Sequence, residues 1–156
     1  MTELILADPA ATERLGQVLG KLLQSGDVVC FTGDLGAGKT HCCRAIAMSL
    51  GVPAGDVTSP TFTLMNVYQG DVEIRHFDFY RLQREEELAD IGFDEYCGGD
   101  GITLIEWAEL FPESLPEEYL QINLQRPAEG RKAALEPHGS RYVQLLKEFE
   151  NAYLGH

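Results

Sequence analysis

Residues 33–40 of this 156-residue chain read "GDLGAGKT" and match the pattern G-x-x-x-x-G-K-[ST] at every fixed position. A short β-rich run at 28–32 leads into these glycines, and a helical pattern over 40–50 follows them. Gly51 and Pro53 close that helix. A strand, a glycine-rich loop and a helix in this order form a binding site for phosphate groups, so the pattern predicts an α/β fold that holds a nucleoside triphosphate.

Each residue type in this loop has its own expected role. Glycines at 33, 36 and 38 allow backbone angles and a close approach that a Cβ atom would forbid. The N–H groups of the loop then face inward as an anion nest, and the positive end of the following helix supports them. Lys39 is expected to reach the β- and γ-phosphates of ATP, and Thr40 Oγ1 to bind Mg²⁺. We therefore expect the whole loop to contact the nucleotide: Gly33, Asp34, Leu35, Gly36, Ala37, Gly38, Lys39 and Thr40.

Hydrolysis needs an acid near the metal and a group that positions water, and two carboxylates compete for these roles. Glu106 lies at the exit of a near-continuous apolar run, 102–107, where ligand sites gather at the carboxyl ends of strands. Asp78 lies in "RHFDFYRL" at the end of a hairpin arm, where composition alone does not decide between a surface acid and a metal ligand. Trp107, the only tryptophan, has on composition alone the features of a core residue.

The stretch "TSPTFTL" at 58–64 allows two interpretations. The simpler one is a proline-punctuated entry into a strand, which the sequence alone favours. In the other, Thr58, Ser59 or Thr61 contacts the γ-phosphate or Mg²⁺ and releases it after hydrolysis, as a switch segment does.

The rest of the chain predicts one domain over residues 1–156. Apolar residues at helical spacing predict helices at 12–23, 83–96 and 139–154. Two β-rich arms flank Gly70-Asp71, and 119–125 with 131–137 suggests a second hairpin. Hairpins require antiparallel pairing, so the central sheet must be mixed.

Charge and composition limit the classes of partner. The chain has 12 Lys and Arg against 25 Asp and Glu, a net charge of −13, which disfavours strong direct binding to nucleic acid but suits docking on a basic partner protein. It contains no apolar run of about 18 residues and no basic, apolar leader at its N-terminus, so we expect a cytoplasmic protein without a membrane span. The four cysteines are expected to be reduced and structural, and the four histidines have no metal-ligand spacing.

The motifs that the chain lacks argue against some classes of nucleotide-binding protein but do not identify one class. The chain has no N-K-x-D motif for guanine, no L-S-G-G-Q motif and no arginine-rich lid, and only Arg126, Arg131 and Lys132 cluster late in the sequence. A small-molecule kinase and a nucleotide-gated binding protein that does not hydrolyse ATP therefore stay open as alternatives. The choice between adenine and guanine also stays open.

Four blocks taken together, "GDLGAGKT", "SPTFTL", "HFDFYRL" and "IEWAE", resemble in order and spacing the bacterial TsaE (YjeE) family. The resemblance extends from the N-terminal helix to about residue 135 and implies a three-layer, P-loop NTPase-like domain whose mixed sheet is mainly parallel. It implies binding and hydrolysis of ATP to ADP with Mg²⁺, in support of threonylcarbamoylation of adenosine 37 in tRNA. The implied partners are TsaD and TsaB, with which the chain would act by nucleotide-dependent assembly and reset of their complex, so that tRNA is contacted only indirectly, through the complex.

The resemblance also implies roles for individual residues. Lys39 and Thr40 match the phosphate loop, and Asp78 matches the aspartate of the family's H-F-D-x-Y-R block. Glu106 and Trp107 match its I-E-W block. It thus implies Lys39, Asp78 and Glu106 as catalytic residues, and Thr40, Asp78 and Glu106 as metal ligands. Thr61, in the switch-like "SPTF", and Trp107 are implied to contact the nucleotide. No internal arginine finger is evident, so we expect slow hydrolysis that partner subunits accelerate.

Overall fold

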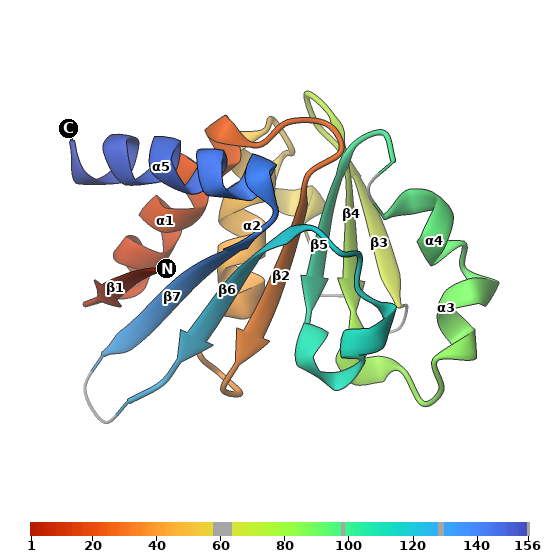
Figure 1. The fold of residues 1–156 in the computed structure, drawn as a ribbon. Coiled ribbons are helices and arrows are strands. Elements are labelled where there is room, and N and C mark those ends of the chain that lie inside the picture. Colours follow the sequence, from red (N-terminus) through yellow and green to blue (C-terminus); the bar gives the residue numbers. More distant parts are fainter. Residues whose placement is uncertain (58–63, 98, 128–129, 156) are drawn as a thin grey trace.

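The computed structural model describes residues 1–57, 64–97, 99–127 and 130–155. Its centre is a seven-stranded sheet with the strand order β1-β7-β6-β2-β5-β4-β3 (Figure 1). The strands are β1 (Thr2–Leu6), β2 (Val28–Gly33), β3 (Met65–Gln69), β4 (Glu73–Asp78), β5 (Ile102–Glu106), β6 (Tyr119–Gln125) and β7 (Arg131–His138). The helices are α1 (Pro9–Leu22), α2 (Lys39–Ser49), α3 (Glu86–Asp90), α4 (Phe93–Tyr96) and α5 (Ser140–Leu154).

The sheet is parallel in its centre and antiparallel at both edges, which confirms the predicted mixed sheet. Strand β2 pairs in parallel with β5 and β6, and β5 pairs in parallel with β4. The hairpin β3–β4 extends one edge, and β7 and β1 extend the other. Phe31 and Asp78 both pair with Glu106, on either side of it. The carboxyl ends of β2, β5 and β4 therefore meet at one edge of the sheet (Figure 1).

Two apolar layers cover the central strands. Strand β2 is buried on both faces, so Phe31 packs in the larger cluster with α1, α2 and α5, whereas Cys30 packs in the smaller cluster on the opposite face. Phe77, Phe79 and Phe93 form the aromatic part of that smaller cluster, with edge-to-face contacts among their rings. The result is the three-layer α/β domain that the sequence and its resemblance predict.

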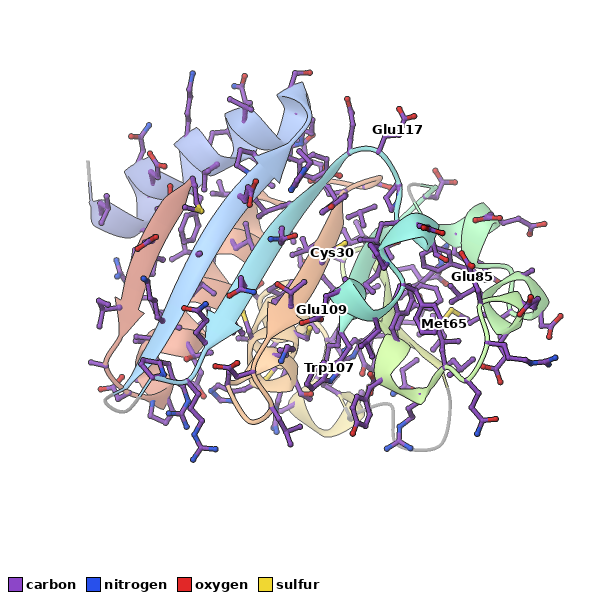
Figure 2. The ribbon with its side chains drawn as sticks, turned by 60° about the horizontal axis from the view of Figure 1, so that its bottom comes forward. Cys30, Met65, Glu85, Trp107, Glu109 and Glu117 are labelled. Atoms are coloured by element: carbon purple, nitrogen blue, oxygen red, sulfur yellow. The ribbon has the colours of Figure 1, made fainter. Side chains whose placement is uncertain are left out.

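The antiparallel edge has one polar face. Figure 2 turns this face of β1, β7 and β6 toward the viewer. Gln121, Asn123 and Lys132 lie together on it, while Leu120, Ile122 and Leu124, which alternate with the polar residues of β6, are fully buried on the other side. A strand with this alternation has one face in the core and one in water.

Three local predictions need correction or extension. The segment 83–96 is two short helices, α3 and α4, rather than one, because Gly92 has a φ of 74° and interrupts the helical backbone. Strand β1 had no sequence prediction and pairs with β7, more than 120 residues away. Helix α1 begins at Pro9, before the predicted start, because the Asp8 side chain caps it by accepting from the N–H of Ala11 at 2.9 Å.

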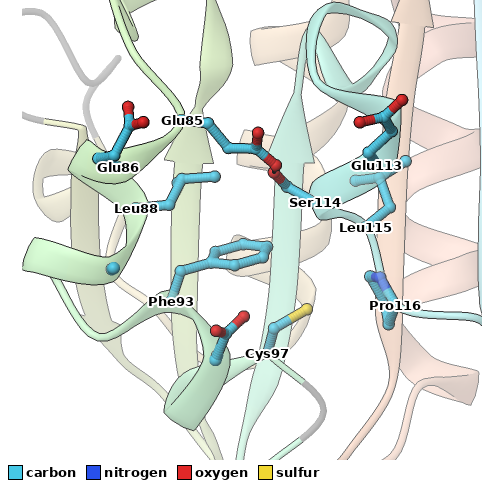
Figure 3. Close-up of a pocket in the computed structure, with 11 residues that line it drawn as sticks. Glu85, Glu86, Leu88, Phe93, Cys97, Glu113, Ser114, Leu115 and Pro116 are labelled. Atoms are coloured by element: carbon cyan, nitrogen blue, oxygen red, sulfur yellow. Dashed lines mark hydrogen bonds between the residues drawn. The ribbon is translucent and has the colours of Figure 1, made fainter.

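A cavity of about 600 Å³, larger than the pockets beside the phosphate loop, lies next to α3 and α4 (Figure 3). Leu88, Phe93 and Leu115 contribute its apolar walls, and four carboxylates line it: Glu85, Glu86, Asp94 and Glu113. A cavity lined by acids repels polyphosphate, so its size does not make it the nucleotide site. Among the described residues, no helix combines the length and the apolar character needed to cross a membrane.

Candidate nucleotide site

The phosphate loop has the backbone that its glycines predict. Gly33, Gly36 and Gly38 have φ angles of 116°, 74° and 105°, all in the region that side chains with a Cβ atom rarely adopt. A Cβ atom on Gly33 would also lie 1.9 Å from the carbonyl oxygen of Leu124 on the neighbouring strand. The loop is therefore tied to the sheet at its start and can curve back toward α2.

Helix α2 begins immediately after this loop, with Gly38 as its N-cap and Lys39 as its first residue. The first N–H groups of a helix have no partner within the helix, and its dipole adds positive potential there. A pocket of about 260 Å³ opens at this point and is lined by loop and helix residues together with Glu106 and Trp107. The pocket thus combines N–H donors, one ammonium group and one carboxylate.

Lys39 is held across the loop. Its Nζ donates to the carbonyl oxygens of Gly33 at 2.9 Å and Asp34 at 2.6 Å. The same atom lies 3.9 Å from the centre of the Trp107 ring, which is a cation–π contact. Burial lowers the pKa of Lys39, and the negative charges of Glu109 and Glu106 oppose that shift. The ammonium group is therefore placed beside the pocket with its charge partly balanced by carboxylates.

Trp107 has an unusual backbone. Its φ of 59° is the only positive value at a described residue other than glycine, and such strain commonly marks a functional site. The residue follows β5 directly, and its half-buried ring lies over Lys39 and 5.0 Å from the Tyr80 ring. Figure 2 shows Trp107 near the carboxyl end of β5. Trp107 therefore lines the pocket and also packs against the smaller apolar cluster, and its implied contact with the nucleotide stays a prediction.

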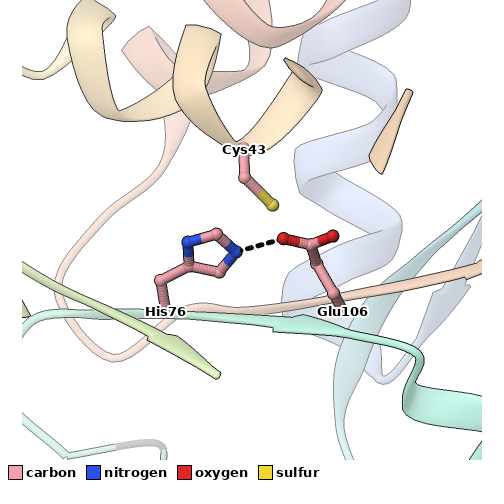
Figure 4. Close-up of side chains that lie close together, drawn as sticks. All are labelled: Cys43, His76 and Glu106. Atoms are coloured by element: carbon pink, nitrogen blue, oxygen red, sulfur yellow. Dashed lines mark hydrogen bonds and ion pairs between the residues drawn. The ribbon is translucent and has the colours of Figure 1, made fainter. Parts of the chain in front are cut away.

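Glu106 is the last residue of β5 and is 3% exposed. Its Oε1 accepts a hydrogen bond from Thr40 Oγ1 at 2.8 Å, so the sequence-predicted metal ligands on α2 and β5 are in direct contact. Its Oε2 lies 2.5 Å from His76 Nε2 (Figure 4). Both oxygens of this carboxylate therefore have partners within the chain.

Asp78 ends β4 beside Glu106 in the sheet register. Its Oδ1 accepts from the N–H of Tyr80 at 3.0 Å, and Arg81 Nε lies 4.0 Å from Oδ2. Burial raises the pKa of Asp78, the hydrogen bond from Tyr80 opposes this shift, and the nearby Glu106 adds to it. Two carboxylates at the ends of adjacent strands, beside a helix that carries Thr40, are a suitable set of oxygen ligands for Mg²⁺.

Comparison with known proteins identifies the family of the chain. The family model for the threonylcarbamoyl adenosine biosynthesis protein TsaE matches residues 6–133. The chain belongs to the TsaE family. The tRNA threonylcarbamoyladenosine biosynthesis protein TsaE of Bacillus subtilis is 39% identical over 143 residues, which are 90% of this chain and 89% of the relative. The TsaE protein of Treponema pallidum is 43% identical over 121 residues, 78% of this chain and 89% of the relative.

A solved structure supports the same fold for this TsaE family member. The crystal structure of Bacillus subtilis YdiB superposes with a TM-score of 0.80 at 33% sequence identity. The match covers 96% of this chain and 94% of YdiB. The two proteins therefore share one fold.

Three site residues of this TsaE family member were not predicted from sequence. Glu109 accepts from the N–H of Gly33 through Oε2 at 2.8 Å, at the start of the phosphate loop (Figure 2). The Arg126 guanidinium lies so near Gly36 that a Cβ atom there would be 3.1 Å from Nη1. His76 contacts Glu106, as described above. For Arg126, the only signal in the sequence was its place in the late basic cluster.

One predicted contact lies outside the described residues. Thr61, together with Thr58 and Ser59, belongs to the segment 58–63, so its expected contact with the γ-phosphate or Mg²⁺ stays a prediction. The other predicted site residues are described. Glu106 and Trp107 line one pocket together with five residues of the phosphate loop, Leu35, Gly36, Gly38, Lys39 and Thr40. Asp78 flanks Glu106 in the sheet.

Proposed function

We propose that this chain binds Mg²⁺ and ATP in its phosphate loop, hydrolyses ATP to ADP, and thereby supports threonylcarbamoylation of adenosine 37 in tRNA together with TsaD and TsaB. The observation that carries the proposal is the direct hydrogen bond between Thr40 of the loop helix and Glu106 at the end of β5. That contact brings a hydroxyl ligand and a carboxylate to the mouth of the anion-binding loop. The relatives are tRNA threonylcarbamoyladenosine biosynthesis proteins, which supports a role in this tRNA modification pathway.

The chain's own groups have separable roles in this proposal. Lys39 exchanges the carbonyl oxygens of Gly33 and Asp34 for phosphate oxygens when nucleotide binds, because phosphate offers a full negative charge. The Thr40 hydroxyl donates a hydrogen bond to Glu106, so the lone pairs on its oxygen stay available to bind a metal ion. Mg²⁺, when bound, neutralises charge on the phosphates. Glu106 and Asp78 are the groups available to orient the attacking water.

A second pocket beside the loop suits the nucleoside. It has a volume of about 370 Å³ and shares Gly36, Gly38 and His41 with the smaller pocket at Lys39. Leu6, Pro9 and Thr12 add an apolar lining next to these shared residues. A base with its sugar in this pocket would leave its phosphates at the start of α2, where the N–H groups are.

The charge of the chain supports an indirect role toward tRNA. A net charge of −13 repels a phosphate backbone, so we propose that the contact with tRNA is made by basic partner subunits. The same charge favours encounter with such partners. We also propose that the chain acts in the cytoplasm and hydrolyses ATP slowly when isolated. TsaD and TsaB would accelerate the hydrolysis by completing or ordering the site.

The first experiment tests hydrolysis. Glu106→Gln should retain binding of ADP and lower kcat about 10²- to 10³-fold, because it removes the carboxylate that orients water while keeping its shape. Glu113→Gln, which removes a carboxylate from the distant cavity, is the matched control and should leave kcat unchanged. Unchanged hydrolysis in Glu106→Gln, or turnover of tens per second by the purified chain alone, would contradict this mechanism.

A second experiment separates the alternatives. ATP labelled at the γ-phosphate should release inorganic phosphate, whereas a small-molecule kinase would transfer the label to an acceptor. In a strain depleted of this chain, Glu106→Gln should fail to restore threonylcarbamoylation of tRNA. Restoration by this variant would favour a binding protein that ATP gates without hydrolysis. Capture of TsaD and TsaB that depends on ATP would support the partner assignment.

A further inference from the structure

His76 is the most enclosed ionisable group next to the site. It lies on β4 with a side chain that is 0% exposed, and it points toward Cys43 on α2 (Figure 4). Its Nε2 contacts Glu106 Oε2 at 2.5 Å, and its Nδ1 contacts the hydroxyl of Tyr68 at 3.1 Å. A buried imidazole with a partner on each nitrogen has one ring orientation, since a flip would break both contacts.

The chemistry of these partners assigns the proton positions. An ionised carboxylate only accepts hydrogen bonds, so the proton between the two groups belongs to His76 Nε2. His76 Nδ1 is then free to accept from the Tyr68 hydroxyl, which can donate. Thr40 donates to the other oxygen of Glu106. Two donors from opposite sides therefore fix the plane of the Glu106 carboxylate.

We propose that His76 is a positioning residue of the nucleotide site: through Nε2–H it holds Glu106 in the orientation in which Glu106 meets Thr40, and Tyr68 fixes the tautomer that makes this possible. The proposal deepens the proposed ATP hydrolysis and rests on it. The Glu106 side chain has several rotatable bonds, and without His76 only its Oε1, which accepts from Thr40, would be held. A carboxylate that swings away would reach neither the metal ligand Thr40 nor a water beside the phosphates.

The neighbouring thiol of Cys43 does not give these residues a different function. The sulfur of Cys43, a nitrogen of His76 and a carboxylate oxygen of Glu106 lie within 4.8 Å of one another, which is the spacing of a metal site. Burial raises the pKa of the Cys43 thiol well above its ordinary value, and the charge of Glu106 adds to this effect. Cys43 is 1% exposed and packs in the larger apolar cluster, so it forms an apolar wall behind the pair.

The first test reads the tautomer in the nucleotide-free chain, independently of activity. In long-range ¹H–¹⁵N spectra of uniformly ¹⁵N-labelled protein, the His76 ring should have the Nε2–H tautomer, and the signals are assigned by their loss in His76→Gln. Tyr68→Phe removes only a hydroxyl and should raise the Nδ1–H population of this ring. An Nδ1–H tautomer in the wild-type chain would overturn the proposal.

The second test reads kinetics. His76→Leu should lower kcat for ATP about 10- to 100-fold, the usual effect of losing a group that orients a ligand, while the Kd for ADP without Mg²⁺ stays within about threefold. His76→Gln can place an amide donor where Nε2–H was and should recover most of kcat. His138→Gln is the matched control, because His138 stacks on Tyr119 at the amino end of β6, opposite the loop.

The outcomes separate this proposal from the proposed function. A folded His76→Leu with wild-type kcat, or a His76→Gln as impaired as His76→Leu, would overturn the positioning role. If His76→Leu fails to fold, Tyr68→Phe carries the kinetic test and should lose about threefold to tenfold in kcat. If the wild-type chain hydrolyses no ATP, the proposed function fails, and the positioning role fails with it whatever tautomer the spectra give.

Discussion

The ammonium group of Lys39 lies 3.9 Å from the centre of the Trp107 ring, and Trp107 is the single tryptophan of the chain. Lys39 Nζ also donates to two loop carbonyls in this arrangement. Phosphate oxygens are stronger acceptors than carbonyl oxygens, so nucleotide should draw the ammonium away from its present partners. The environment of the only indole in the protein would then change.

Nucleotide binding should therefore be visible as a change in intrinsic fluorescence. Titration with ADP and Mg²⁺ should give a saturable change in the emission of Trp107. Lys39→Ala should raise the Kd at least about tenfold, because charge-assisted hydrogen bonds contribute about 1.5–3 kcal/mol. The control Lys147→Ala removes an exposed ammonium from α5 and should bind as the wild type does. If calorimetry detects no heat when ATP or ADP is titrated with Mg²⁺ into the folded chain, the phosphate loop is not a nucleotide-binding site.

Replacement of Glu109 should strengthen nucleotide binding, whereas replacement of Lys39 should weaken it. Its carboxylate accepts from Gly33 N–H at the start of the loop and is the foremost charge acting on Lys39. A negative charge there repels a polyphosphate, so Glu109→Gln should lower the Kd for ADP about threefold to tenfold at low salt. The difference should shrink as salt screens it. Weaker ADP binding by Glu109→Gln would mean that the carboxylate instead supports Lys39.

Arg126 should contribute to binding although it lies far along the chain. Its backbone N–H donates to Asp34 Oδ2 at 2.8 Å, and its guanidinium lies beside Gly36. Arg126→Ala should raise the Kd for ATP about threefold to tenfold, with a smaller effect on kcat, because an exposed cation next to phosphates adds mainly binding energy. Arg84→Ala is the control, because it removes the same positive charge from an exposed residue outside the pocket. Equal affinities of the two variants would exclude a phosphate contact by Arg126.

The sequence predicted the parts of the site that are local. The loop 33–40 needs only neighbouring residues to form, and Glu106 could be placed at a strand end because a buried apolar run precedes it. The expected hairpin around Gly70-Asp71 is also local, and β3 and β4 pair as predicted. In each case, residues within about 20 positions of one another decide the structure.

The residues that sequence analysis missed act across the sheet. His76 has no metal-ligand spacing along the chain, but its strand neighbours β5, so it meets a residue 30 positions away. Glu109 meets Gly33 over 76 positions, after a short turn that begins at the strained Trp107 backbone. A single glycine, Gly92, decides between one helix and two, and apolar spacing in 83–96 does not reveal its positive φ.

Tyr142 allows a prediction about stability and pH. Its hydroxyl accepts from the N–H of Val28 at 2.8 Å, where α5 packs on the start of β2, and Arg141 next to it pairs with Asp27 at 2.8 Å. Burial raises the pKa of Tyr142 from 10.0 to about 12, and the bond from Val28 opposes this shift. Between these values the unfolded chain loses the tyrosine proton while the folded chain retains it. The stabilisation is complete below pH 10 and is lost as the pH rises toward 12.

Urea unfolding from pH 8 to 11 should therefore distinguish Tyr142→Phe from the wild type. At pH 8 the variant should be less stable by about 1–2 kcal/mol, because a buried N–H loses its acceptor. Above pH 10 the difference in free energy of unfolding between the wild type and Tyr142→Phe should narrow. The wild type then loses at most about 1.4 kcal/mol per pH unit through the Tyr142 proton, and the variant has no such proton to lose. Tyr80→Phe, at a residue that is 62% exposed, is the control replacement and should depend on pH as the wild type does. Parallel curves for wild type and Tyr142→Phe would mean that the Tyr142 proton is not linked to folding.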